Sequence, residues 1–252
     1  MTERQPHTAA ILLIGDEILS GRTQDANLAY ISKKLNEVGV QVREARVVPD
    51  IEAEIVAAVN ALRARYAYVF TTGGIGPTHD DITADSIAAA FGVACDYHPE
   101  AYAMMEAGYA PGEFTEARKR MARTPVGASL IPNPVSKAPG FRVENVFVMA
   151  GIPRVMHVML DGALPLLEGG KPVLTRSIGV HLPEGRFGTA LGEVQQGFPD
   201  VSIGSYPFLR EGRYGASLVF RSDDRARLDA AAEAVRVMLS GIGGDPFDEN
   251  PA

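Results

Sequence analysis

Apolar runs and amphipathic segments alternate along the N-terminal part of the chain. Residues 9–14 (AAILLI) are continuously apolar, a pattern typical of a strand buried on both faces of a parallel sheet. A predicted strand at 40–48 and an apolar run at 66–70 follow, and segments with helical spacing of hydrophobic residues lie at 28–38 and 51–62. This β-α-β-α-β-α order predicts an α/β fold with a doubly wound, mostly parallel sheet and helices on both faces.

The region that follows is less regular. Residues 99–125 show a helical pattern that Gly108 and Pro111-Gly112 interrupt, and residues 143–150 form the next predicted strand. The segment 113–123 is rich in cations, which are Arg118, Lys119, Arg120 and Arg123. These side chains form either a solvated helix face, a clamp on ligand phosphates or a partner surface.

The pattern changes after residues 168–172 (EGGKP), a Gly- and Pro-containing stretch that we interpret as a linker. Beyond it the predicted elements are a strand at 173–180, a helix at 187–196, strands at 201–206 and 214–221, and a helix at 224–239. This β-α-β-β-α order predicts a second, smaller α+β domain. The predicted domains are therefore residues 8–168 and 173–240, followed by a loose tail at 241–252 that is rich in Gly, Pro and Asp.

Charge and cysteine usage exclude several classes of protein. The formal net charge of −7 argues against broad binding to nucleic-acid backbones, which requires a positive surface. Residues 185–188 (GRFG) match the bare G-x-x-G of KH domains, but four-residue matches are common by chance and the surroundings are not basic. The single cysteine, Cys95, permits no internal disulfide and suits a reducing compartment. Since no apolar run approaches the roughly 20 residues that span a bilayer, we expect a cytoplasmic protein without nucleic-acid or membrane partners.

Residues 71–83 (TTGGIGPTHDDIT) carry the strongest chemical signal, because they join an apolar strand to a helical pattern. Glycines let backbone N–H groups approach a phosphate closely, and the start of a helix adds a positive dipole. We therefore expect a phosphate site formed by Thr72, Gly73, Gly74, Gly76, Pro77 and Thr78. The stretch is not a P-loop, since no Gly-Lys-Ser/Thr follows, and it lacks the Rossmann spacing. Lys137 is either a surface charge or a further phosphate contact.

Carboxylates accompany the glycine loop. Asp80 and Asp81 follow it directly, and Asp50 comes at the end of another predicted strand. These acids could hold a divalent cation that a bound phosphate shares. For Asp80 and Asp50 the competing interpretation is a helix cap, a role that aspartate fills well. Asp16 and Glu17 follow the first strand, where they either cap a turn or accept hydrogen bonds from ligand hydroxyls.

Five segments, taken in order, resemble a known family. They are GDEILSG at 15–21, TQDAN at 23–27, VPD at 48–50, TGGIGPTHDD at 72–81 and APGF at 138–141. In these segments the chain resembles the molybdopterin-binding-type (MoCF biosynthesis) domain of CinA-like proteins, and most closely the amino-terminal domain of eukaryotic FAD synthase. More distantly it is similar to the enzymes that bind or adenylylate molybdopterin. The remainder resembles the small KH-like domain of CinA. It resembles neither the deamidase domain of CinA nor the adenylyltransferase domain of FAD synthase, so we expect neither of those activities.

The resemblance implies a nucleotide pyrophosphatase that hydrolyses the diphosphate bond of FAD or ADP-ribose with Mg, Mn or Co. By matching positions it gives functional carboxylates to Asp50 and Asp81 and a phosphate loop to residues 73–78. Many CinA-like proteins carry a carboxylate where this chain has Val155, which leaves open binding without turnover or another substrate. The alternatives are molybdopterin binding or adenylylation, with a pterin phosphate as ligand, and a non-catalytic nucleotide-binding module. Relatives form dimers and trimers, so we expect a homo-oligomer.

Overall fold

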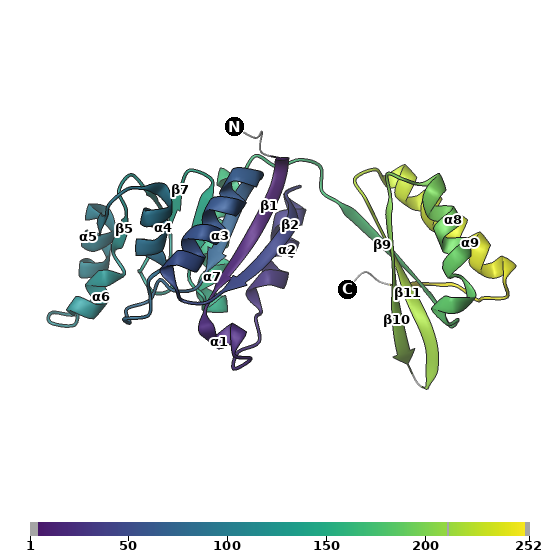
Figure 1. The fold of residues 1–252 in the computed structure, drawn as a ribbon, viewed down its shortest axis with the longest axis horizontal. Coiled ribbons are helices and arrows are strands. Elements are labelled where there is room, and N and C mark those ends of the chain that lie inside the picture. Colours follow the sequence, from purple (N-terminus) through teal and green to yellow (C-terminus); the bar gives the residue numbers. More distant parts are fainter. Residues whose placement is uncertain (1–4, 211, 250–252) are drawn as a thin grey trace. The chain divides into compact units, whose positions relative to one another are not determined.

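The computed structural model describes residues 5–210 and 212–249. The chain forms two compact units, Met1–Gly170 and Lys171–Ala252 (Figure 1). The elements of the first unit are β1 (Gln5–Ile14), α1 (Asp16–Leu19), α2 (Asn27–Glu37), β2 (Gln41–Val48), α3 (Glu52–Arg65), β3 (Tyr66–Thr72), α4 (Thr83–Phe91), β4 (Cys95–Tyr97), α5 (Pro99–Gly108), α6 (Glu116–Arg120), β5 (Arg123–Pro125), β6 (Ser129–Ile131), β7 (Gly140–Val143), β8 (Val146–Met149) and α7 (Pro153–Ala163). A short 3₁₀ turn at Leu164–Leu166 follows α7.

The first unit is built on a six-stranded sheet with the order β2-β1-β3-β8-β7-β6. The pairs β1–β2, β1–β3 and β3–β8 are parallel, whereas β7 is antiparallel to both of its neighbours. The prediction of a doubly wound, mostly parallel sheet is therefore confirmed. Residues 9–14 of β1 are all buried, as expected for a central strand that is covered on both faces.

Alternate residues of each strand feed two separate cores, one on each face of the sheet. On one face Leu12 and Ile14 pack with residues of α3 and α4 such as Ile55 and Ile87. On the other face Ile11 and its neighbours pack with residues of α2 and α7. Both helical layers thus hold the sheet rigidly, and the loops after its parallel strands emerge from a fixed edge (Figure 1).

The structure corrects the prediction of an interrupted helix over residues 99–125. Helix α5 ends at Gly108, α6 is only one short helix, and residues 123–125 form the strand β5, which pairs antiparallel with β4. A cluster of aromatic side chains, in which Tyr102 and Tyr109 each contact Phe114, fills the space between α5 and α6. The interruption at Pro111-Gly112 therefore marks a change of element and not a kink within one helix.

The second unit is a four-stranded antiparallel sheet packed against helices. Its elements are β9 (Leu174–Val180), a 3₁₀ turn (Glu184–Arg186), α8 (Gly188–Gly197), β10 (Ser202–Arg210), β11 (Arg213–Ser222), α9 (Arg225–Gly241) and β12 (Phe247–Glu249). The sheet order is β10-β11-β9-β12. The predicted β-α-β-β-α order is confirmed, but the tail is not loose throughout, because β12 pairs with β9. Its last residues, 250–252, lie outside the described part of the chain.

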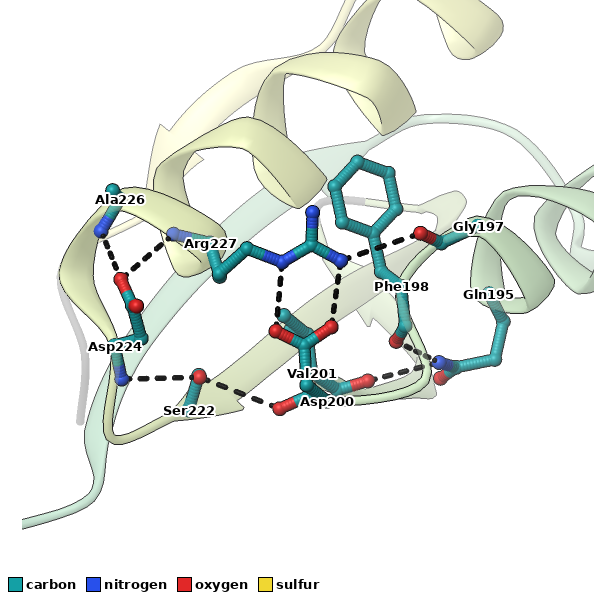
Figure 2. A network of polar contacts seen from close by, with 9 residues as sticks. All are labelled: Gln195, Gly197, Phe198, Asp200, Val201, Ser222, Asp224, Ala226 and Arg227. Carbon is teal, nitrogen blue, oxygen red and sulfur yellow. Dashed lines mark hydrogen bonds and ion pairs between the residues drawn. The ribbon is translucent and has the colours of Figure 1, made fainter.

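A network of polar contacts joins the two helices of this unit to its sheet (Figure 2). The Arg227 guanidinium donates two hydrogen bonds to the Asp200 carboxylate, at 2.7 and 2.6 Å, which lowers the pKa of Asp200. The Gln195 amide donates to the carbonyls of Phe198 and Val201 at the end of α8, both at 2.9 Å. The side chain of Asp224 caps α9 by accepting from the amides of Ala226 and Arg227, at 2.8 and 3.1 Å.

Replacing Asp224 with alanine is expected to destabilise the start of α9 by about 1 kcal/mol, because two helical amides lose their acceptor. Hydrogen exchange at the first-turn amides of α9 would report this as faster exchange. Asp223→Ala is the matched control, since it removes the same charge from the preceding residue. Equal exchange rates in both variants would show that the cap contributes nothing.

Within the residues that the structure describes, no helix combines the length and hydrophobicity that crossing a bilayer requires.

Candidate functional site

The loops that follow the parallel strands of the first unit surround one cavity of about 580 Å³. Its walls come from the residues after β1, β2, β3 and β8, and from the loop between β6 and β7. Such an edge, at the carboxyl ends of parallel strands, is where ligands bind in open α/β sheets. The cavity also lies within the size range of small-molecule sites.

The glycine loop after β3 forms one side of this cavity, through Gly73, Gly74, Ile75, Gly76 and Pro77. Two of these glycines have left-handed backbones, with φ of 106° at Gly73 and 66° at Gly74, a conformation that glycine adopts at little cost. The loop is held from behind by Thr83, the first residue of α4. Its hydroxyl donates to the Gly73 carbonyl at 2.9 Å, and its amide donates to the Gly74 carbonyl at 3.0 Å.

Three consecutive amides of the loop have no partner among the residues that the structure describes. The N–H groups of Gly74, Ile75 and Gly76 donate no hydrogen bond to any residue that the structure describes. Backbone donors in a concave turn, ahead of a helix start, form an anion-binding arrangement. The geometry therefore suits a phosphate or carboxylate group at this side of the cavity.

Asp81 lies against the loop and is held there by Thr78. One oxygen, Oδ2, accepts hydrogen bonds from the Thr78 amide at 2.8 Å and from the Thr78 hydroxyl at 2.5 Å. A Cβ at Gly76 would lie 2.6 Å from the same oxygen, so a side chain at this position would push the carboxylate from the place it occupies. The other oxygen, Oδ1, accepts no hydrogen bond from the described residues.

Asp50 also lines the cavity close to the glycine loop, since its Oδ1 would lie 3.5 Å from a Cβ added at Gly74. Its Oδ2 accepts a hydrogen bond from the Asp16 backbone amide at 3.0 Å. The competing interpretation as a helix cap is wrong for Asp50, because the N-cap of α3 is Ile51 and no side chain caps that helix. It is wrong for Asp80 as well, because the N-cap of α4 is Ile82, again without a side-chain cap.

Burial and acidic neighbours together raise the pKa of Asp50. Burial of its carboxyl group is the main cause, and the negative charges of Asp16, Glu17 and Asp80 add to it, while the hydrogen bond from the Asp16 amide acts in the opposite direction. Keeping a half-buried acid ionised beside other acids costs folding free energy. A bound cation would lower that cost.

Replacing Asp50 with asparagine is expected to raise the melting temperature at pH 7. The pKa of Asp50 is higher in the folded state, so the folded state is penalised once the pH is above the pKa of the unfolded chain, about 3.9. The difference in melting temperature between the variant and the wild type should shrink as the pH falls towards about 3.9, the unfolded-state pKa. Calorimetric scans between pH 3 and 7 measure it, with Asp161→Asn, on an exposed helix face, as the control for net charge. A variant less stable than wild type at pH 7 would contradict this prediction.

The other predicted site residues fall into two groups. Glu17 and Asp80 line the cavity together with Asp50 and Asp81. The side chains of Asp16, Thr72, Thr78 and Lys137 are not part of the lining. Asp16 and Thr78 instead position the two acids through the contacts described above.

For Lys137, predicted as either a surface charge or a phosphate contact, the structure shows no place in the lining of the cavity. The residue has a left-handed backbone, with φ of 66°, and the stem of its side chain lies over Gly108 at the end of α5. Its loop does reach the cavity, but through Asn133, Ser136 and Ala138. Asn133 shapes that loop by donating to the Ala138 carbonyl at 2.7 Å.

Several apolar side chains also line the cavity and form what we call its apolar wall, most of which was not predicted from the sequence. They are Ile152, Val155 and Met159, before and within α7, together with Met121 and Ile75. Val155 is 8% exposed, belongs to the core beneath α7 and lines the cavity as part of this wall. Ile152 is 66% exposed. A large exposed isoleucine beside a helix start is the signal that could have identified this wall.

The acids fit a cation that is shared with a ligand. Among the described residues, no three His, Cys, Asp or Glu side chains are grouped closely enough to hold a metal ion by themselves. Mg²⁺ commonly keeps several waters and binds one or two carboxylates plus substrate phosphates. Asp50 and Asp81 each keep one oxygen without a hydrogen bond from a described residue, so they can supply such carboxylate ligands.

Comparison with known proteins agrees with the fold. A family profile described as "Probable molybdopterin binding domain" matches residues 10–169, and one described as "FAD synthase, middle domain" matches residues 172–243. A protein of Pyrobaculum calidifontis is 37% identical over 79% of this chain and 80% of its own length. The "Probable FAD synthase" of Caenorhabditis elegans is 30% identical over 95% of this chain, but the match spans only 52% of the worm protein.

Among solved structures, CinA from Thermoplasma acidophilum, whose function its description gives as unknown, is similar to the first unit. The two share 34% sequence identity at a TM-score of 0.60, over 63% of this chain and 96% of the CinA chain. The expected resemblance to CinA-like proteins and to FAD synthase is thereby confirmed. The glycine loop, the acids around it and the sheet that carries them are those of a domain in the molybdopterin-binding family, to which this chain belongs.

Proposed function

We propose that the first unit binds an adenine dinucleotide-like molecule, such as FAD or ADP-ribose, in the cavity at the sheet edge and hydrolyses its diphosphate bond with a divalent cation. The observation that carries this proposal is the arrangement of the cavity itself. Four carboxylates, apolar side chains and a glycine loop whose amides at 74–76 have no partner among the described residues all line this one cavity. A phosphate group matches the amides, and a flat ring system matches the apolar side chains.

Each element of the site has a role in this proposal. The amides of Gly74, Ile75 and Gly76 hold the phosphoryl oxygens and stabilise the charge that develops on them. Asp81 and Asp50 hold the cation, or orient water beside it, through their unpaired oxygens. A divalent cation supplies Lewis acidity towards the phosphoryl group and lowers the pKa of bound water. Glu17 lines the cavity after β1, where it can accept hydrogen bonds from ribose or ribityl hydroxyls.

Two alternatives rest on specific observations. The description of the family that matches residues 10–169 favours a pterin phosphate as ligand, with binding or adenylyl transfer as the function. The apolar Val155, at a position where many relatives carry an acid, favours a module that binds a nucleotide without turning it over.

A product assay separates these possibilities. The protein is incubated with FAD, ADP-ribose or ATP plus molybdopterin, in the presence of Mg²⁺, Mn²⁺, Co²⁺ or EDTA, and nucleotides are separated by chromatography. The proposal expects AMP from a dinucleotide, with no product in EDTA. Adenylylated pterin would instead support the molybdenum-cofactor role. Saturable binding without any product would support the binding module and contradict the hydrolase.

A further inference from the structure

The charge of the cavity is unbalanced. Glu17, Asp50, Asp80 and Asp81 contribute carboxylates, and no Lys, Arg or His is among the described residues that line it. A diphosphate adds further negative charge, and like charges at short range repel strongly in a partly desolvated site. A cation shared between acids and phosphate offsets part of this repulsion, but a basic side chain within reach would offset more of it.

A second, much smaller hollow of about 20 Å³ lies against the same glycine loop. It shares Gly74, Ile75, Gly76, Asp81 and Met121 with the large cavity. Unlike the large cavity, it is lined by basic side chains, those of Arg120 and Arg123. The hollow is too small for a ligand, but it brings two arginine residues next to the loop whose amides at 74–76 have no partner among the described residues.

The structure decides between the possible roles of the cationic segment. Arg118 donates to the Glu113 carbonyl at 2.5 Å and lies 4.5 Å from the centre of the Tyr109 ring. Lys119 pairs with Glu116 at 2.6 Å. Arg118 therefore ties α6 to the preceding segment, and Lys119 pairs within α6, so both side chains already have partners.

Arg123 is engaged as well, but its partner anchors the segment to the site. Its guanidinium donates two hydrogen bonds to the Asp85 carboxylate on α4, at 2.9 and 2.7 Å. Helix α4 begins where the glycine loop ends, so this pair fixes the position of the segment relative to the loop. The Asp85 carboxylate compensates the charge of Arg123, so Arg123 is not free to pair with a ligand.

Arg120 remains, and it differs from the other three. It is the last residue of α6, is half-buried, and lines the hollow beside the loop. Its guanidinium group makes no hydrogen bond or ion pair with any residue within 5–210 and 212–249. A half-buried guanidinium without a partner is uncommon, because burial of an unpaired charge is costly.

We propose that Arg120 binds the phosphate group held by Gly74, Ile75 and Gly76. A guanidinium presents a planar fork of donors that matches phosphate oxygens, which is why arginine serves at such sites. Arg120 thus supplies the positive side chain that the lining of the large cavity lacks. This inference deepens the proposed function and rests on it, because it concerns the phosphate of the same ligand.

Calorimetric titration with AMP and with adenosine tests the role of Arg120, because neither compound has a diphosphate bond to hydrolyse. Titrations are run in Mg²⁺ and in EDTA. Arg120→Ala is expected to weaken AMP binding roughly ten- to hundredfold and to leave adenosine binding unchanged. Arg120→Lys should fall between wild type and Arg120→Ala, since it keeps the charge but loses the fork. Arg154→Ala is the matched control and should bind AMP as wild type does, because Arg154 is exposed and outside the lining.

Three results would overturn the assignment of Arg120. One is AMP binding by Arg120→Ala that equals that of wild type. Another is a parallel loss of AMP and adenosine binding, which would indicate a structural role. The third is a wild-type protein that binds AMP no better than adenosine, which would overturn the proposed phosphate site together with Arg120. The first two leave the proposed function standing, so the two failures can be told apart.

Discussion

Replacing Asp81 with asparagine is expected to reduce the rate of metal-dependent AMP release by roughly a hundredfold or more. Losses of this size are typical when an enzyme loses one group that stabilises the charge developing in the transition state. Asparagine keeps an oxygen that can accept from the amide and hydroxyl of Thr78, so the loop should keep its shape. The negative charge is lost, and with it the attraction for a cation. The measurement is the initial rate of AMP formation at saturating metal and substrate.

Two further measurements make this result specific. Asp161→Asn removes the same charge from an exposed face of α7 and should hydrolyse the substrate at the wild-type rate. The melting temperature of Asp81→Asn should stay close to that of wild type, which excludes unfolding as the cause. If Asp81→Asn keeps its rate, the carboxylate has no part in the reaction and the mechanism is wrong, even where AMP release itself is real.

Replacing Gly73 with alanine is expected to destabilise the first unit by about 2 to 4 kcal/mol. Two costs combine at this position. The backbone has φ of 106°, which a residue with a side chain adopts only under strain, and an added Cβ would collide with the carbonyl oxygen of Ile14 at the end of β1. Because that atom belongs to the backbone of the central strand, the collision is not easily relieved. Urea unfolding followed by circular dichroism measures the change.

Gly92 provides the matched control for the strain term. It also has a left-handed backbone, with φ of 67°, but an added Cβ there meets no atom within 4 Å. Gly92→Ala should therefore cost only about 1 kcal/mol. Equal losses of unfolding free energy for Gly73→Ala and Gly92→Ala would show that the close approach of β1 to the loop adds no cost to the Gly73 substitution.

Much of the fold could be predicted because the local signals agree with the tertiary arrangement. The continuous apolar run at 9–14 specifies a central strand, and the glycine loop at 73–76 specifies a turn between a strand and a helix. Segments where local signals are weak were predicted less well. The strand β5 has only three residues, and β12 lies in a stretch rich in Gly, Pro and Asp, so pairing with β4 and β9 determines these strands.

The site was predicted as a set of residues but not as a set of contacts. Strand ends bring Asp50 and Asp81 to one cavity, which the β-α-β order implies. That Asp16 and Thr78 act by positioning these acids follows only from hydrogen bonds between loops. The same holds for Arg120, because one sequence pattern, four cations within six residues, contains three paired side chains and one that has no partner among the described residues.

The central claim is that the amides of the glycine loop hold the phosphate of a nucleotide. Titrating isotope-labelled protein with AMP in the presence of Mg²⁺, and following backbone amide resonances by NMR, tests it most directly. We predict that the largest shifts occur at Gly74, Ile75 and Gly76, and that adenosine does not reproduce them. Unchanged resonances at these three amides, while AMP saturates another part of the protein, would contradict the account.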